Sequence, residues 1–259
     1  MQKDAINNAL TTAEHGLLDR SERLLGHEGM ARLATKRVIL FGVGGVGSWC
    51  AECLIRSGIQ HLTLVDNDKV VATNCNRQLM ATTQTLGQIK VEAMKERLLT
   101  INPTADIQAL CATYTSETAN NFALETYDYI IDAIDSLKDK ADLILRASAI
   151  CHKEKNVHVL SSMGAALRVD PTKIRVDEFW NVKGDALARA LRNTFKRHKT
   201  FPASKFKCVY SEEVPLPNLG ETTETSSYKA QINGSMCPVT GIFGMTLAGI
   251  VIKDAAERI

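Results

Sequence analysis

The sequence predicts an α/β fold: a mostly parallel β-sheet with helices on both faces and an antiparallel extension. Short apolar runs of strand length alternate with longer segments of helical spacing, which favours parallel pairing. A glycine run follows the first apolar run directly, and an aspartate ends the second. Because 259 residues can bury one large core, we expect a single domain, with a core at residues 18–165 and an extension at residues 166–259.

The strands of the core are short apolar runs bounded by turn residues. They are expected at residues 37–41, 61–65, 107–111, 129–133 and 157–161. The helices between them place apolar residues three and four positions apart. They are expected at residues 20–34, 45–57, 84–99 and 137–151, with a further helical pattern between residues 111 and 129.

The pattern changes after Gly164. Residues 165–169 and 174–176 flank Asp170-Pro171, which predicts two strands joined by a turn. These strands would extend the sheet in antiparallel fashion. Residues 212–234 then predict a mobile loop.

The uncharged stretch at residues 239–252 has the composition of a membrane span but not the length. A bilayer requires about 20 apolar residues. Pro238 and the polar Asn233-Gly234-Ser235 precede the stretch, as they would at the start of a helix. We expect a buried helix against the sheet or a partner subunit. Integral membrane insertion is not expected, while peripheral membrane association stays open.

The glycine run Gly42-Val43-Gly44-Gly45-Val46-Gly47 joins the strand at 37–41 to the next helix. Side chains at such a turn would collide with phosphate oxygens, and the free N–H groups of the helix favour an anion. Asp66 ends the next strand, where a carboxylate can accept hydrogen bonds from ribose hydroxyls. The arrangement predicts a Rossmann-like nucleotide site, and a purely structural glycine turn is the alternative. Its expected members are Gly42, Gly44, Gly45, Gly47 and Asp66.

Polar residues downstream suit a polyphosphate. Arg77 ends a polar loop, and Lys90 lies near the start of a helix, where the dipole favours anions. Asp135 follows the strand at 129–133, where it can cap the next helix or hold Mg²⁺. Surface roles are the alternatives for Arg77 and Lys90. The residues expected to contact the nucleotide here are Thr73, Asn74, Asn76, Arg77, Lys90, Asp135 and Ser136.

Four segments in order resemble the ubiquitin-activating-type superfamily of ThiF- and MoeB-like adenylating enzymes. They are Asp66-Asn67-Asp68-Lys69-Val70, Thr73-Asn74-Cys75-Asn76-Arg77-Gln78, Gly87-Gln88-Ile89-Lys90 and Asp132-Ala133-Ile134-Asp135. The resemblance implies that ATP adenylates a carboxylate, with catalytic roles for Arg77, Lys90 and Asp135 and with Asp135 as the Mg²⁺ ligand. It also implies a homodimer, in which the catalytic Arg23 reaches the triphosphate of the neighbouring subunit.

Later segments resemble one branch of this superfamily, the tRNA threonylcarbamoyladenosine dehydratases. They are Gly164-Ala165-Ala166 with Asp170-Pro171, residues 185–189 and residues 207–213. The resemblance implies that ATP activates the threonylcarbamoyl carboxylate on a tRNA adenosine, and that this group then closes into a ring. It leaves open a monovalent cation (Na⁺ or K⁺) and a sulfur-transfer protein partner.

The segment at residues 183–207 is basic, with eight basic side chains and one acidic one. Asp185 opens a helix within it. A basic stripe on this helix would track the phosphates of tRNA and bind less tightly at high salt. A solvated helix face explains the same residues without RNA. The stripe consists of Arg189, Arg192, Lys196, Arg197 and Lys199.

Two other functions share the glycine turn. Adenylation of a ubiquitin-like sulfur-carrier protein would use the same ATP site, but relatives of that kind commonly hold zinc with two C-x-x-C pairs. This chain has only Cys50-Ala51-Glu52-Cys53. The second alternative is an NAD-dependent oxidoreductase or a nucleotide-sensing module. Cys208 and Cys237 could form a thioester, although such cysteines are more often core thiols.

The composition favours a cytoplasmic protein. The chain has 31 basic and 29 acidic residues, so its net charge attracts neither nucleic acid nor membrane. Seven cysteines, an odd number in apolar segments, indicate reduced thiols. Residues 1–19 mix polar and charged side chains and do not resemble a secretion signal.

Overall fold

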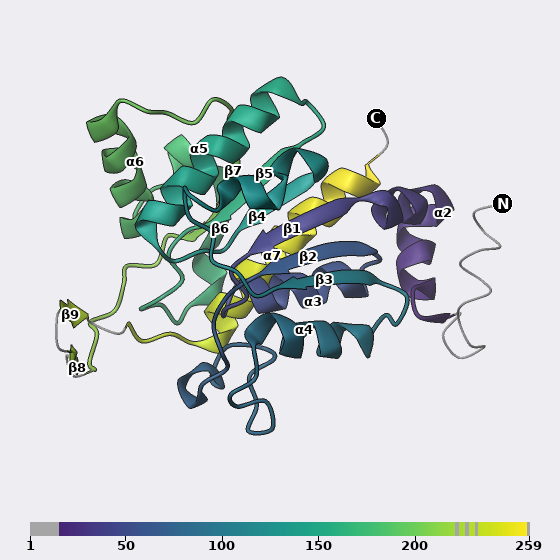
Figure 1. Cartoon of the computed structure of the whole chain (residues 1–259), viewed down its shortest axis with the longest axis horizontal. Coiled ribbons are helices and arrows are strands. Elements are labelled where there is room, and N and C mark those ends of the chain that lie inside the picture. The colour runs from purple at the N-terminus through teal and green to yellow at the C-terminus, as the bar shows by residue number, and fades with distance from the viewer. Residues whose placement is uncertain (1–15, 221–222, 226–227, 231–232, 258–259) are drawn as a thin grey trace.

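The computed structural model describes residues 16–220, 223–225, 228–230 and 233–257, and these form a seven-stranded sheet flanked by helices (Figure 1). The strand order is β3-β2-β1-β4-β5-β7-β6, and β6 runs antiparallel to β7. The predicted Rossmann-like α/β fold with an antiparallel extension is confirmed. The strands are β1 (Arg37–Phe41), β2 (His61–Val65), β3 (Asp106–Leu110), β4 (Tyr129–Asp132), β5 (His158–Ser162), β6 (Ile174–Glu178) and β7 (Lys207–Ser211).

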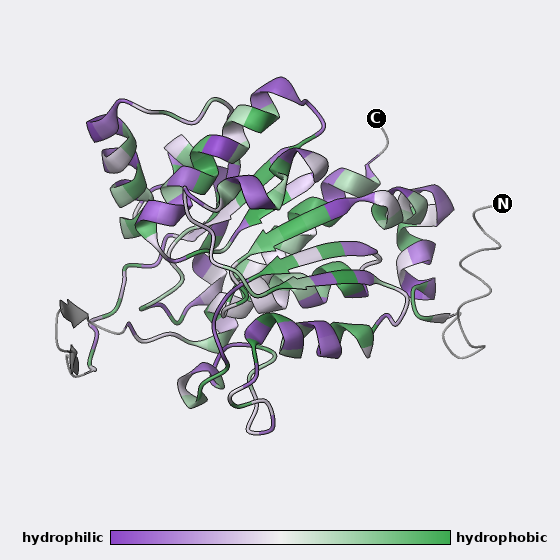
Figure 2. Ribbon diagram, viewed as in Figure 1, coloured by the Kyte–Doolittle hydropathy of each residue, from purple (hydrophilic) through white to green (hydrophobic). Residues whose placement is uncertain are grey.

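Helices cover both faces of the sheet. Val38 and Leu40 of β1 pack in one core with α3, α4 and α7, whereas Ile39 and Phe41 pack in a second core with α5 and α6. After its exposed first residue, Arg37, β1 is therefore apolar on both faces, and Figure 2 shows the central strands mostly in green. The helices are α2 (Asp19–Thr35), α3 (Gly47–Arg56), α4 (Lys90–Leu99), α5 (Leu137–Lys153), α6 (Ala186–His198) and α7 (Cys237–Ala256).

The topology places a crevice at one edge of the sheet. Strands β1, β2, β4 and β5 are parallel, so their carboxyl ends meet at the same edge. The strand order reverses between β1 and β4, because the chain passes first to β2 and β3 on one side and then to β4 on the other. Ligands of open α/β sheets bind at such a reversal.

Two predicted helices differ from the observed ones. The helix expected from residue 84 begins at Lys90, because the preceding residues form turns and Gly87 has a positive φ of 84°. The helical pattern between residues 111 and 129 gives only two short 3₁₀ helices, Ala119–Phe122 and Leu124–Thr126. Ala123 between them has a left-handed φ of 44°, which interrupts the helix.

The strand predicted at residues 174–176 is present as β6, but it does not pair with residues 165–169 as predicted. Residues 165–169 form a loop, in which Leu167 has a φ of 60° and Arg168 turns inward. The carboxylate of Asp170 caps a 3₁₀ helix at Pro171–Lys173 by accepting a hydrogen bond from the N–H of Thr172. Strand β6 therefore pairs with β7, a strand that the sequence pattern did not predict.

The loop predicted at residues 212–234 lies partly outside the described residues, at 221–222, 226–227 and 231–232. Within the described part, β8 (Thr223–Thr225) and β9 (Tyr228–Ala230) form an antiparallel pair. The mobility of this segment stays a prediction.

Helix α7 is a core helix, as predicted. Within the described part of the chain it is the one helix long and apolar enough to cross a membrane, but half of its apolar stretch is buried inside the protein. Gly244 lets it approach the start of α3, since a Cβ there would lie 2.2 Å from the carbonyl oxygen of Val46. Peripheral membrane association stays open.

Candidate active site

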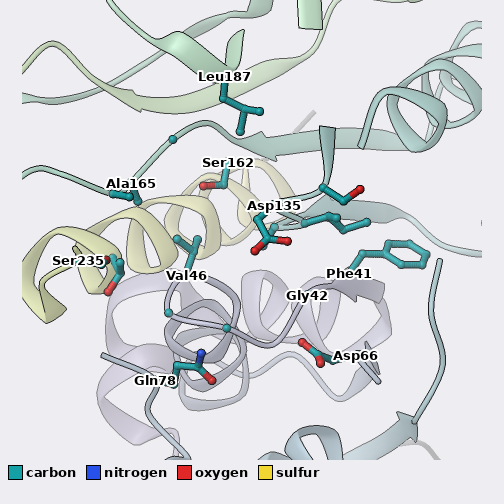
Figure 3. A pocket seen from close by; sticks show the side chains of 18 of the residues that line it. Phe41, Gly42, Val46, Asp66, Gln78, Asp135, Ser162, Ala165, Leu187 and Ser235 are labelled. Carbon is teal, nitrogen blue, oxygen red and sulfur yellow. The ribbon is translucent and has the colours of Figure 1, made fainter. Parts of the chain in front are cut away.

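A cavity of about 960 Å³ opens at the carboxyl edge of the sheet (Figure 3). This volume is at the upper end of the range for small-molecule sites, which leaves room for a nucleotide and part of a second substrate. Nine of the residues predicted for the nucleotide site line this cavity: Gly42, Gly44, Gly45, Asp66, Asn74, Arg77, Lys90, Asp135 and Ser136.

The glycine turn forms the floor beside β1. Gly42 has a φ of 87°, and a Cβ there would lie 2.6 Å from the carbonyl oxygen of Ala133. A Cβ on Gly47 would lie 1.8 Å from the carbonyl oxygen of Gly42, so Gly47 shapes the turn without lining the cavity. Gly44 differs, because the nearest atom to its Cβ position is Nε2 of Gln78 at 3.9 Å. Its missing side chain leaves space for a ligand.

Asp66 holds the glycine turn in place. Its Oδ2 accepts a hydrogen bond of 2.7 Å from the N–H of Val43, and its Oδ1 accepts one of 2.9 Å from the N–H of Asp68. A carboxylate has about four acceptor positions, so two stay available on the side that borders the cavity. Asp66 can therefore still accept the predicted hydrogen bonds from ribose hydroxyls.

Two cations border the same cavity. Lys90 is 5% exposed, and its ammonium donates a hydrogen bond of 2.7 Å to Oδ2 of Asp68. The guanidinium of Arg77 donates to the carbonyl oxygen of Thr73 and to Oδ1 of Asn76. Thr73 and Asn76 do not line the cavity, so they orient Arg77 instead of contacting a ligand themselves.

Asp135 is the free carboxylate of the site. It is exposed, and among the described residues nothing donates a hydrogen bond to it. Ser136 next to it donates to Oδ2 of Asp139 at 2.7 Å. In the described ranges no three His, Cys, Asp or Glu side chains are placed to hold a metal together. One carboxylate does fit Mg²⁺, which keeps several waters and is bound mainly by substrate phosphates.

A buried ion pair below the cavity was missed from the sequence. Asp132 ends β4, and its Oδ2 accepts hydrogen bonds from Lys140 at 2.7 Å and from Ser161 at 2.6 Å. Lys140 also donates to the carbonyl oxygen of Ile134. The pair thus fixes the segment that leads to Asp135. The helical spacing was a usable signal, because Lys140 lies on the apolar face of α5 with Ile144 and Ala147.

The opposite wall of the cavity contains a second buried ion pair, also missed from the sequence. Arg168 and Asp185 are 3% and 1% exposed, and Nη2 of Arg168 lies 3.3 Å from Oδ2 of Asp185. Asp185 also accepts from the N–H of Gly164 and caps α6 by accepting from the N–H of Ala188. The pair fixes the wall formed by residues 164–168 and by Leu187. Figure 3 shows Leu187 of this wall on the other side of the cavity from Asp66.

Gln78 has an unpartnered polar atom at the cavity. The side chain is 5% exposed, and its Oε1 is buried without a hydrogen-bond partner among the described residues. Buried amide groups normally have partners. Since Gln78 lies next to Gly44, a ligand over the glycine turn would supply one.

Arg23 does not belong to the cavity of its own chain. It is exposed on α2, which lies at the far end of the sheet from the carboxyl edge (Figure 1). Its predicted role in a neighbouring subunit stays a prediction. The same holds for the monovalent cation and the sulfur-transfer partner.

The cysteines do not form a reactive centre at this site. Cys208 is fully buried on β7, and burial raises the pKa of its thiol well above the usual range. Burial likewise raises the pKa of Cys50 on α3. Cys237 does not line the cavity. A neutral thiol is a poor nucleophile, so the geometry gives no support to a thioester at Cys208.

Comparison with known proteins agrees with this arrangement. A profile of the ThiF family matches residues 18–257. The chain belongs to the ThiF family. It is 35% identical over 247 residues to a tRNA threonylcarbamoyladenosine dehydratase of Bacillus subtilis, covering 93% of this chain and 94% of that one. It is 36% identical over 245 residues to the Haemophilus influenzae protein of the same name, covering 91% and 92%.

Solved structures of the ThiF family extend the comparison to the ligand. The Escherichia coli tRNA N6-threonylcarbamoyladenosine dehydratase in complex with ATP is similar with a TM-score of 0.80 and 30% identity. The match covers 95% of this chain and 96% of that one. The same Escherichia coli protein has also been solved with AMP. An adenine nucleotide, and not a nicotinamide dinucleotide, is thus the ligand of this relative.

Proposed function

We propose that this chain is an ATP-dependent tRNA threonylcarbamoyladenosine dehydratase. It converts the threonylcarbamoyl group on a tRNA adenosine into a cyclic form through an acyl-adenylate. The observation that carries the proposal is the convergence of the glycine turn, Arg77 and Lys90 on one cavity. Its support is a match to these dehydratases that spans 93% of the chain.

ATP is seated by the glycine turn. The phosphates lie against the N–H groups of the turn at Gly44, where a side chain would block them, and at Gly45, whose Cβ position is next to Thr240 and Arg77. Asp66 accepts hydrogen bonds from the ribose, and the orphaned Oε1 of Gln78 accepts one from the nucleotide or its bound water. Lys90 and Arg77 stabilise the charge that develops on the phosphate oxygens.

Mg²⁺ fits next to Asp135. Its carboxylate is free, and a single carboxylate with phosphates and waters is a usual donor set for this ion. When bound, the metal would neutralise phosphate charge. The Asp132 and Lys140 pair holds the loop of Asp135 in place.

The chemistry has two steps. An oxygen of the threonylcarbamoyl carboxylate attacks the α-phosphorus, the bond to the β-phosphate breaks, and pyrophosphate leaves. The activated carbonyl carbon is then attacked from within the same substituent, a ring closes, and AMP leaves with the former carboxylate oxygen. The net result is the loss of one water from the modified adenosine. No enzyme nucleophile is needed, which agrees with the neutral thiol of Cys208.

The enzyme acts as a homodimer, with Arg23 contributed to the site of the partner subunit. Arg23 is exposed on α2, next to Leu24, which is 83% exposed. Ile242 and Met245 leave apolar surface near the start of α7, whose other end contacts α2 through Ala256. Exposed apolar side chains on both helices favour contact with a second copy.

The test is incubation of the purified protein with ATP and tRNA that carries threonylcarbamoyladenosine. We expect AMP, pyrophosphate and, by mass spectrometry, loss of one water from the nucleoside. Arg77→Ala and Asp135→Ala should each abolish AMP formation, while Lys155→Ala, an exposed control, should not. Wild-type turnover by both site variants would overturn the assignment. Pyrophosphate exchange that needs a carrier protein and no tRNA would favour the sulfur-carrier alternative.

A further inference from the structure

An exposed aromatic pair lies beside the basic helix α6. Trp180 and Phe201 are 40% and 54% exposed, and their ring centroids lie 6.2 Å apart at an angle of 44°. Large aromatic rings are normally buried or bound to a partner. Neither ring lines the cavity, so the adenylation site does not explain them.

Buried aromatic rings support Trp180. Trp180 meets the buried ring of Phe179 edge-on at 5.1 Å, and Phe179 stacks on Phe206 at 5.0 Å. Arg192 on α6 donates a hydrogen bond to the carbonyl oxygen of Phe179 and lies over its ring. Trp180 thus rests on a ring that is held against α6, and Phe201 contacts Trp180 in turn, an arrangement that lowers the entropic cost of binding.

Basic side chains lie on α6, the helix that packs beside the pair. The apolar side of α6 is buried, so its exposed side presents Arg189, Lys196 and Arg197, followed by Lys199. Two acidic side chains, Asp177 and Glu178, precede Trp180, and each has one oxygen held by a local hydrogen bond. Asp177 accepts from the side chain of Asn181, and Glu178 accepts from the N–H of Trp180.

The N-terminal end of α6 borders the active site. Asp185 caps α6, and Leu187 in its first turn lines the cavity (Figure 3). Thirteen residues of helix span about 20 Å. A nucleic acid strand whose adenosine enters the cavity would therefore continue along α6 toward Trp180 and Phe201.

We propose that Trp180 and Phe201 form a stacking platform for an unpaired base of the tRNA, near the adenosine that enters the cavity. Arg189, Lys196 and Arg197 contact the phosphates between the two positions. Unpaired bases are the part of RNA that proteins hold by stacking on aromatic rings, and such stacking tolerates any base. The proposal rests on the proposed function, because it takes tRNA as the substrate.

The direct test is binding without turnover. The chain has two tryptophans, Trp49 and Trp180. Titration with a short single-stranded oligoadenylate should quench the fluorescence of Trp180, and the quench should be lost in Trp180→Phe while binding is retained. Trp180→Ala should raise the Kd for oligoadenylate and for unmodified tRNA about fivefold or more. The Kd for ATP should stay unchanged. Phe201→Ala, at the more exposed ring, provides a second variant.

The charged side of the surface has a matched control. Lys196→Ala should lower the slope of log Kd against log salt by about one, the contribution of one phosphate contact. Lys155→Ala changes an exposed lysine in the turn after α5 and should leave the slope unchanged.

Wild-type RNA affinity in both Trp180→Ala and Phe201→Ala would overturn the proposal. So would an unchanged RNA affinity with altered sedimentation, which would assign the pair to a protein interface. Because the RNA-binding measurements use neither ATP nor modified tRNA, they are independent of whether the dehydration reaction is observed.

Discussion

The ammonium of Lys140 lies 2.7 Å from the carboxylate of Asp132, and neither side chain is exposed to solvent. Ser161 donates to the same carboxylate oxygen, and the N–H of Ile134 donates to the other. The pair joins β4, β5 and α5 directly below the loop of Asp135. A complete set of partners is what makes a buried charge pair tolerable.

Removing one member should be costly. We expect Lys140→Met to lower the free energy of unfolding by about 3–5 kcal/mol, because Asp132 would be left charged and buried. Lys138→Met changes an exposed lysine on the same helix and should be nearly neutral. Urea unfolding measures both. The double variant Asp132→Asn with Lys140→Met should recover part of the loss, and a Lys140→Met protein as stable as the control would contradict the pairing.

Two glycines of the turn should respond differently to alanine. Gly42→Ala should lower stability, because its positive φ and the contact with Ala133 exclude a Cβ. Gly44→Ala should fold normally but raise the Kd for ATP, since only a ligand would meet the new methyl group. Thermal unfolding and ATP titration separate the two effects. Normal ATP affinity in Gly44→Ala would place the phosphates elsewhere.

Mixed dimers test the role of Arg23. Arg23→Ala and Arg77→Ala should each be inactive alone, but an equal mixture after subunit exchange should recover about a quarter of the wild-type activity. In half of the dimers, one site then has an intact Arg77 and receives an intact Arg23. A mixture of Arg77→Ala with Lys90→Ala is the control and should stay inactive, because both residues belong to one site. Recovery in neither mixture would exclude a role across the dimer.

Lys90 should act on the chemical step. We expect Lys90→Ala to slow AMP formation by about 100- to 1,000-fold, as for the loss of one group that stabilises transition-state charge. Lys95→Ala, on the same helix but outside the cavity, should have little effect. Single-turnover kinetics at saturating ATP separates chemistry from binding. A change confined to KM would make Lys90 a binding residue only.

Cys208 should be dispensable for catalysis. Burial raises the pKa of its thiol, so the rise of pH through the usual cysteine range favours the thiolate of an exposed cysteine more than that of Cys208. Cys208→Ala should therefore retain turnover, with some loss of stability from the cavity left behind. Alkylation should reach the exposed Cys75 and Cys111 first. Loss of activity in a well-folded Cys208→Ala protein would instead support a thioester at Cys208.

Much of the predicted nucleotide site could be predicted from the sequence, because the patterns that indicate it lie within short segments of the chain. The glycine turn needs glycine for steric reasons visible in a short segment, and parallel strands bring their carboxyl ends to one edge whatever the details between them. This is why Asp66, Arg77, Lys90 and Asp135 could be expected together, and the structure places all four around one cavity.

The second wall was not predictable in the same way. Arg168 and Asp185 meet because a loop turns inward at Leu167, and no periodic pattern marks such a turn. The sequence of β7 likewise contains no pattern that identifies it as a strand, since a short apolar run next to a basic segment fits a loop as well as a strand. Its assignment comes from pairing with β5 and β6, which only the folded chain defines.

The contact between Gly244 and the carbonyl oxygen of Val46 has a consequence for biogenesis. The end of the glycine turn packs against a helix that the ribosome makes much later, so the turn has all its neighbours only after α7 has docked. We expect ATP to stabilise the protein most strongly from that point on. Nucleotide-dependent protection from proteolysis should therefore appear abruptly, late in synthesis.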